Sequence, residues 1–87
     1  MKYVVMYETA PDVTAKLVEH FPAHRALWAG YQAEGTLLAI GPFSDQSAAM
    51  AVFTTREAAE QFVKEDPFVL NGAIQSWTIR EWNEALL

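Results

Sequence analysis

The segment Glu65–Gly72 reads EDPFVLNG and joins a predicted helix to the last predicted strand. Proline disfavours the α conformation of the residue before it, so the helix should end at or just before Asp66. Asp66 is also a good N-cap, and Pro67 fits the first helical position because a missing N–H costs nothing there. Asn71-Gly72 can supply the left-handed residue that stops a single turn. The segment therefore predicts a short helical turn that leads the chain into its final strand.

The pattern of apolar residues predicts the other elements. Alternation and β-branched residues predict strands, whereas apolar residues at i, i+4 and i+8 predict helices. Pro22 cannot continue a helix without losing a hydrogen bond, so a helix is expected on either side of it. Thr54 and Glu57 fit a capping box, and Gly35 fits a helix stop. The expected order is a strand at 2–8, helices at about 12–20 and 22–34, strands at 36–41 and 48–53, a helix ending near 65 and a strand at 73–82.

This strand–helix–strand–strand–helix–strand order is typical of an α+β, ferredoxin-like sandwich in one domain, residues 1–87. Its antiparallel four-stranded sheet should carry the helices on one face, because crossovers are right-handed. The first three strands are apolar on both faces, so a lone chain would leave an apolar patch in water. We therefore expect a homodimer that pairs two sheets face to face about a two-fold axis.

The composition excludes several functions. A net charge of -5 without any cluster of Lys or Arg argues against a nucleic acid or an anionic membrane as partner. The chain has no cysteine, which excludes thiol catalysis, and no phosphate loop or nucleotide fingerprint, so we expect no cofactor. No apolar run approaches the roughly 18 residues of a membrane span and no signal-peptide pattern is visible, so a cytoplasmic protein is expected.

Only two histidines are available for chemistry, His20 and His24. Their spacing can bind zinc on one helix face, but the expected break at Pro22 argues against a metal site. His24 lies near the start of the longer predicted helix, and it is either a half-buried structural histidine or a catalytic imidazole whose tautomer is fixed by a carboxylate. The candidate carboxylate is Asp66, which is either a helix cap alone or the residue that orients His24. The residue types leave both pairs of alternatives open.

Three segments together resemble one known family. They are Phe21–Leu27 (FPAHRAL), Glu34–Pro42 (EGTLLAIGP) and Glu65–Gly72 (EDPFVLNG), and they match in order, spacing and end-to-end coverage. The chain is thus similar to the YCII family (YciI-like proteins), whose members are mostly of unknown function. The resemblance implies a ferredoxin-like fold and a dimeric α+β barrel, which agrees with the sheet-to-sheet dimer expected from the strands.

The resemblance also implies an active site built on a histidine–aspartate pair, which maps onto His24 and Asp66. One activity known in the family is dehydrochlorination of a chlorinated hydroxyquinol, which implies a lyase or isomerase acting on small aromatic-derived compounds. Phe21 stands where relatives often carry a basic residue, which argues against an anionic substrate. The alternative is a non-catalytic small-ligand-binding module or a structural dimer, since the same cleft would serve binding.

We expect a small-molecule ligand to lie in a cleft between the first helix and the sheet. Backbone N–H groups near Gly41 could steady a developing oxyanion there. The expected substrate-binding residues are Tyr7, Arg25, Trp28, Gly41, Phe43 and Phe68.

Overall fold

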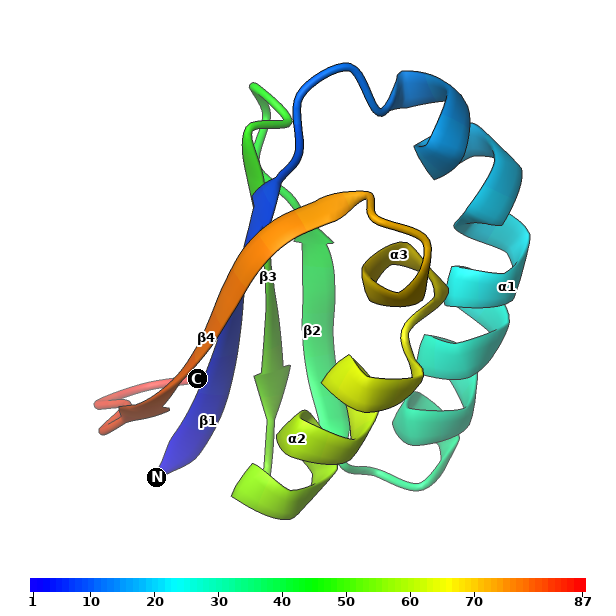
Figure 1. Cartoon of the computed structure of the whole chain (residues 1–87). Coiled ribbons are helices and arrows are strands. Elements are labelled where there is room, and N and C mark those ends of the chain that lie inside the picture. The colour runs from blue at the N-terminus through cyan, green and yellow to red at the C-terminus, as the bar shows by residue number, and fades with distance from the viewer.

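The computed structural model describes all 87 residues and shows a four-stranded sheet with its helices on one side (Figure 1). The strands lie in the order β2-β3-β1-β4, and each neighbouring pair is antiparallel, as expected for a ferredoxin-like sandwich. The elements along the chain are β1 (Lys2–Thr9), α1 (Thr14–Ala33), β2 (Leu37–Pro42), β3 (Ala48–Phe53), α2 (Arg56–Glu65), α3 (Pro67–Leu70) and β4 (Ile74–Trp82).

The core lies between the sheet and the helices. Alternate residues of the central strands, Val5 on β1 and Phe53 on β3, point toward the helices and are almost fully buried. Phe62 of α2 packs against Phe53 with 5.3 Å between ring centroids, and Tyr31 of α1 meets both rings edge-on. These aromatic contacts hold α1 and α2 on the same face of the sheet, which fixes where their functional side chains can meet.

Helix α1 runs unbroken through Pro22, so the expectation of two helices that meet at this residue was wrong. Proline removes the hydrogen bond to the carbonyl four residues earlier, which is that of Val18. Both Val18 and Pro22 are exposed, so water can reach this part of the helix. After Pro22, the α1 residues Leu27, Trp28 and Tyr31 pack against the core. His24 consequently lies in the middle of a 20-residue helix and not in its first turn.

The caps at the other helix ends follow local rules with one shift. Asp66 ends α2 in an extended conformation and caps α3, accepting the Phe68 N–H at 3.1 Å, as its sequence context predicted. The cap of α2 is Thr55, whose hydroxyl accepts the Ala58 N–H, and not the expected Thr54. Thr54 donates its own N–H to the Thr36 carbonyl at 2.9 Å, which keeps it in line with the sheet and moves the helix start one residue on.

Two glycines should respond to alanine in opposite directions. Gly35 ends α1 with φ at +82°, and an L residue there costs about 1–2 kcal/mol. Gly30 lies inside the helix, and a Cβ there would meet no atom within 4 Å. We therefore expect Gly35→Ala to lower the free energy of unfolding by about 1–2 kcal/mol and Gly30→Ala to raise it by about 0.5–1 kcal/mol. Urea unfolding measures both, and a stabilising Gly35→Ala would contradict this assignment.

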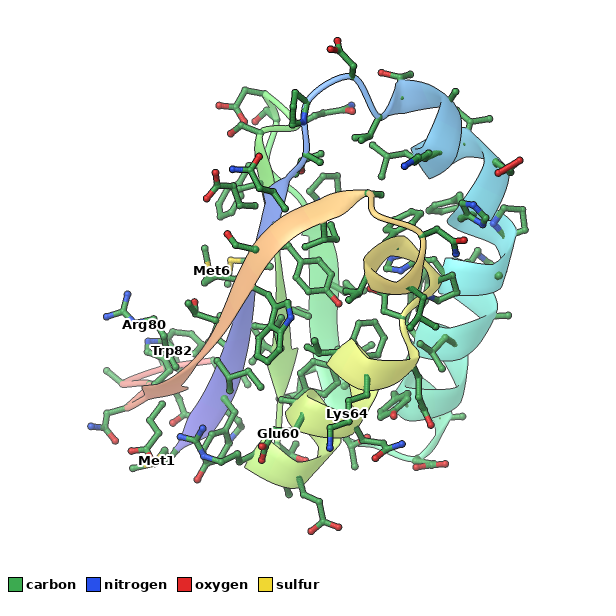
Figure 2. The ribbon with its side chains drawn as sticks, in the orientation of Figure 1. Met1, Met6, Glu60, Lys64, Arg80 and Trp82 are labelled. Carbon is green, nitrogen blue, oxygen red and sulfur yellow. The ribbon has the colours of Figure 1, made fainter.

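The second face of the sheet carries no helix. Val4 pairs with Val52 across the two central strands, and Met6 lies on the same side two residues along. Figure 2 shows that Met6, Arg80 and Trp82 project from the side of the sheet that lies away from the helices. Trp82 remains 38% exposed, so this face combines apolar residues of the central strands with a partly exposed indole.

Candidate active site

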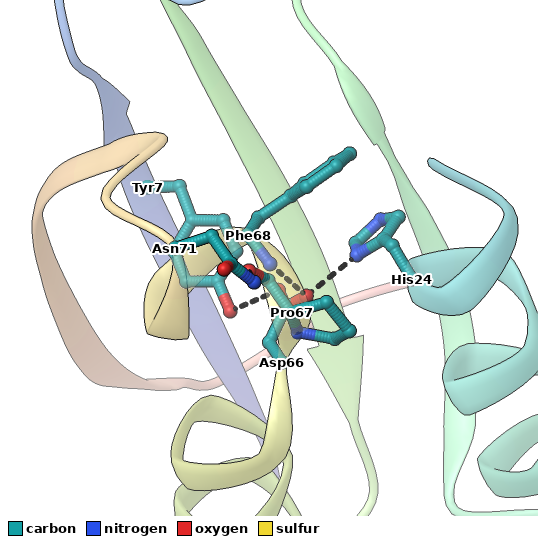
Figure 3. A network of polar contacts seen from close by, with 6 residues as sticks. All are labelled: Tyr7, His24, Asp66, Pro67, Phe68 and Asn71. Atoms are coloured by element: carbon teal, nitrogen blue, oxygen red, sulfur yellow. Dashed lines mark hydrogen bonds and ion pairs between the residues drawn. The ribbon is translucent and has the colours of Figure 1, made fainter. Parts of the chain in front are cut away.

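The centre of the site is the carboxylate of Asp66, which is fully buried between α2 and α3. Its Oδ2 accepts the Tyr7 hydroxyl at 2.7 Å, and its Oδ1 accepts the Phe68 N–H at 3.1 Å. The same Oδ1 lies 2.8 Å from Nδ1 of His24, which is 42 positions away in the chain (Figure 3). Because Tyr7 and Phe68 both donate to the carboxylate, it acts as an acceptor and His24 donates Nδ1–H. The expected contact between His24 and Asp66 is confirmed, and Asp66 also caps a helix.

Three elements bring these side chains together. Tyr7 lies on β1 and points toward the helices, as does Val5 two residues earlier. The Asp66-Pro67 turn places the carboxylate at the start of α3, which packs against α1. His24 is the buried residue of α1 at this point. The pair therefore depends on the packing of α1 against α3 as much as on the local cap.

Aromatic neighbours fix the plane of the His24 ring. Phe68 stacks on it with 4.0 Å between ring centroids and an interplanar angle of 15°. Phe62 and Phe21 each approach it with centroids 6.2 Å away. Together with the bond to Asp66, these contacts hold the imidazole in one orientation.

The second ring nitrogen of His24 is free. Figure 3 shows it pointing away from Asp66, and no protein group forms a hydrogen bond with it. Every buried side-chain nitrogen and oxygen has a partner, so an unpartnered Nε2 must be accessible to solvent. His24 also lines a pocket of about 460 Å³.

The pocket lies between α1 and the sheet, as expected for the ligand cleft. Of the 17 residues that line it, 11 are hydrophobic, and His24 is the one among them that can carry a charge near neutral pH. Three of the expected substrate-binding residues line it: Tyr7, Gly41 and Phe68. The wall also includes residues that the sequence did not single out, among them Leu17, Val18, Ile40, Gln46, Ala49 and Ala51.

The other three expected substrate-binding residues lie outside this wall. The guanidinium of Arg25 lies 5.5 Å from the centroid of the Trp28 ring, and Trp28 packs against the core. Phe43 lies in the turn between β2 and β3 and is 41% exposed. The structure thus gathers Tyr7, Phe68 and Gly41 around His24, and it does not bring Arg25, Trp28 or Phe43 to the same pocket.

The bond from Tyr7 to Asp66 was not anticipated, although one signal could have found it. Tyr7 shares the helix-facing side of β1 with Val5, so its hydroxyl had to meet a polar partner within the helix layer. Burial, with the neighbouring Asp66 charge and hydrogen bond, raises the pKa of the Tyr7 phenol well above its usual value. Tyr7 is therefore a neutral donor that stabilises the carboxylate.

Replacement of Tyr7 by phenylalanine should destabilise the fold by about 1–3 kcal/mol, because it leaves Oδ2 of Asp66 buried without a donor. The matched control is Tyr31→Phe, since the Tyr31 hydroxyl bonds the exposed Glu65 at the same 2.7 Å. That change should cost less than about 1 kcal/mol. Urea unfolding of the three proteins makes the comparison, and equal losses for the two variants would contradict a buried role for the Tyr7 hydroxyl.

The same substitution should change how stability depends on pH. Tyrosine in the unfolded chain ionises near pH 10, whereas Tyr7 stays protonated in the fold because its pKa is raised. The unfolded state then binds fewer protons than the folded state, so the free energy of unfolding falls as pH rises above about 10. In Tyr7→Phe this fall should be shallower.

Comparisons with known proteins place the chain in a family. The family model described as the YCII-related domain matches residues 1–83. The chain belongs to the YCII family. No curated protein matches this YCII chain in sequence.

Solved structures similar to this YCII chain share its fold. The dehydrochlorinase TftG of Burkholderia phenoliruptrix AC1100, in complex with 2,5-dihydroxybenzoquinone, superposes with a TM-score of 0.80 at 17% identity, over 98% of this chain and 96% of that one. PA3566 from Pseudomonas aeruginosa superposes with a TM-score of 0.58 at 19% identity, over 98% of this chain and 93% of that one. An antibiotic biosynthesis monooxygenase superposes with a TM-score of 0.58 at 18% identity, over 98% of both chains. These likenesses show a shared α+β architecture.

The residues of the site are suited to acid–base chemistry. No three His, Asp or Glu side chains are grouped so that they could hold a metal ion. His20, which lies one helical turn before His24, places its Nε2 3.0 Å from the Glu19 carboxylate. No helix of this YCII chain has the length and apolar character needed to cross a membrane. The site contains an imidazole that is bonded to a buried carboxylate and lines an apolar pocket, an arrangement suited to taking up and returning a proton.

Proposed function

We propose that this chain is a small-molecule enzyme of the lyase or isomerase kind, in which His24 transfers a proton and Asp66 holds its tautomer. One observation carries the proposal: Nδ1 of His24 lies 2.8 Å from a buried Asp66 while His24 lines an apolar pocket of about 460 Å³. A histidine held only for packing would not need both a buried carboxylate bonded to Nδ1 and an accessible Nε2. Proton transfer by such a histidine is typically worth about 10²–10⁴ in rate.

The proposed step begins when Nε2 of His24 takes a proton from a C–H or O–H group of the ligand. The bonding electron pair stays on the ligand, and the Asp66 carboxylate stabilises the imidazolium that forms. In an isomerisation, His24 returns the proton to another ligand atom. In an elimination, the electron pair expels a leaving group such as chloride and the proton passes to water. The ligand thus loses one proton and one chloride ion, and the reaction involves no net oxidation or reduction.

The similar structures support the kind of ligand. TftG is named as a 5-chloro-2-hydroxyhydroquinone dehydrochlorinase, and it was solved with 2,5-dihydroxybenzoquinone, a planar ring compound. The pocket of the present chain has apolar walls and no Lys or Arg, which suits a ring without a fixed negative charge. We therefore propose a hydroxylated or chlorinated ring compound as the substrate class.

Deuterium exchange tests the proposal without knowledge of the true substrate. The chain would be incubated in D₂O with hydroxyhydroquinone, chlorohydroquinone and related rings, and C–H signals would be followed by proton NMR together with release of chloride. We expect exchange or chloride release that exceeds the protein-free rate for at least one ring. Saturable binding without exchange for every ring bound would reject the enzyme and favour the non-catalytic binding module.

We also propose that two copies pair through the open face of the sheet. On that face Met6 is half-buried and Trp82 is 38% exposed, beside Val4 and Val52, which the single chain already buries. A second sheet of the same shape would cover the apolar side chains that stay accessible on this face.

Replacement of Met6 by glutamate should shift the protein from dimer to monomer, because a charge would be buried without a partner at the centre of the interface. Lys64→Gln is the matched control, since it changes the net charge by the same amount on α2, away from the open face of the sheet (Figure 2). Sedimentation velocity at micromolar concentration measures both. A wild-type protein that sediments only as a monomer of 9.7 kDa, with no species of twice that mass, would reject the dimer.

A further inference from the structure

We propose that the ligand of the His24 pocket is an uncharged, largely apolar compound about the size of two fused rings, with one hydrogen-bonding end at His24. This inference rests on the proposed function only in taking the pocket as the substrate site. It goes further in the size and the polarity of the compound that the pocket selects.

The volume of the pocket sets the size. An apolar cavity of about 150 Å³ is enough to hold a benzene molecule. The pocket beside His24 measures about 460 Å³, roughly three times that. A single ring would leave most of the apolar wall in contact with water. A ligand of two fused rings, or of one ring with a short apolar chain, would cover more of it.

The small side chains of β3 explain why the pocket is deep. Ala49 and Ala51 lie on the helix-facing side of β3, opposite Tyr7 and Val5 of β1, and both line the pocket. Larger residues at these positions would fill the space between α1 and the sheet. The depth is therefore built by the sheet itself and does not depend on a mobile side chain.

The distribution of polar groups sets the polarity. No Asp, Glu, Lys or Arg lines the pocket, so a charged group of the ligand would lose water and gain no partner of opposite sign. His24 and Tyr7 line the pocket at the end next to Asp66, and Nε2 of His24 has no hydrogen-bond partner in the protein. A ligand with one O–H or acidic C–H at this end and an apolar remainder matches that arrangement.

The rim of the pocket shows where the remainder extends. Val18 and Phe21 of α1 line the pocket and are also 71% and 48% exposed, so they belong both to the wall and to the surface. Gln46 lies opposite, in the turn between β2 and β3. The second ring of the ligand is therefore expected to lie between the first half of α1 and this turn.

A matched pair of probes tests the size: 2-naphthol and phenol, which share a hydroxyl and differ by one fused ring. Calorimetry or amide NMR titration would give their dissociation constants with the wild-type chain. The extra ring should improve the affinity about tenfold, from the additional apolar area buried. The amide shifts caused by 2-naphthol should include Val18 and Gln46, whereas those caused by phenol should be confined to the surroundings of His24.

Substitution at the rim distinguishes binding in the pocket from non-specific hydrophobic binding elsewhere on the protein. Val18→Asp should weaken 2-naphthol about fivefold and leave phenol unchanged, because only the second ring reaches Val18. Leu70→Asp is the control, since Leu70 is 67% exposed on α3 and lies outside the pocket. It should change neither affinity. Both positions are exposed, so both variants should fold.

The outcomes keep the two proposals apart. Equal affinities for the two probes, or equal weakening of both by Val18→Asp, would overturn the two-ring ligand whatever the deuterium exchange shows. Tighter binding of 2-naphthol than of phenol, weakened selectively by Val18→Asp, would support it, even if no ring exchanges deuterium and the enzyme proposal fails.

Discussion

His24→Ala is expected to lower the rate of deuterium exchange or elimination about 10²–10⁴-fold, while the dissociation constant of the same ligand changes only a few-fold. The physical reason is that Nε2 is the accessible base of the pocket, whereas most of the binding surface is apolar and stays in place. Turnover and binding would be measured on the same ring compound, by NMR and by calorimetry. A loss of binding equal to the loss of turnover would contradict a role in proton transfer.

Two controls belong to this experiment. His20→Ala removes the other histidine of the same helix, which lies beside Glu19, and it should leave turnover unchanged. Added imidazole should restore part of the activity of His24→Ala, because the deleted ring leaves a space of its own shape against Phe68. If imidazole fails to rescue a well-folded His24→Ala and His20→Ala loses activity, the catalytic base is His20 and not His24.

The sequence predicted the succession of strands along the chain and the turn at Asp66-Pro67 because both follow local rules. Alternation marks the buried face of a strand, and an Asp-Pro pair marks a cap wherever it lies. Pro22 shows where a local rule fails. Its missing N–H costs one hydrogen bond, whereas Leu27, Trp28 and Tyr31 of the same helix pack against the core. The sum of those contacts is invisible in the sequence around residue 22.

The site was predictable only in part. The residue types alone did not decide whether His24 and Asp66 are structural or catalytic. The resemblance to the YCII family paired them, although they lie 42 positions apart. Arg25 follows His24 in sequence, but the next residue of a helix is rotated by about 100°, which directs it toward Trp28 and not into the pocket. Ala49 and Ala51 shape the pocket by the volume that they lack, and a missing side chain leaves no pattern to detect.

Asp66→Ala is expected to lower the free energy of unfolding by about 3–5 kcal/mol, because two buried donors lose their acceptor at a cost of about 1–3 kcal/mol each. The change leaves the Tyr7 hydroxyl and the His24 N–H buried without an acceptor, and it also removes the cap of α3. A cap alone would cost about 0.5–2 kcal/mol. Domains of this kind are stable by about 5–15 kcal/mol, so the loss should be plain in urea unfolding at neutral pH.

Asp66→Asn separates the structural part from the chemical part. The amide oxygen can still accept from His24 and cap Phe68, so this variant should be more stable than Asp66→Ala. It lacks the negative charge that stabilises an imidazolium, so turnover should still fall sharply. Asp45→Ala is the matched stability control, because Asp45 holds Ser47 in an exposed turn, and it should cost less than Asp66→Ala. If Asp66→Ala costs no more than a cap and Asp66→Asn keeps full activity, the His24–Asp66 pair has no role beyond ending one helix and starting the next.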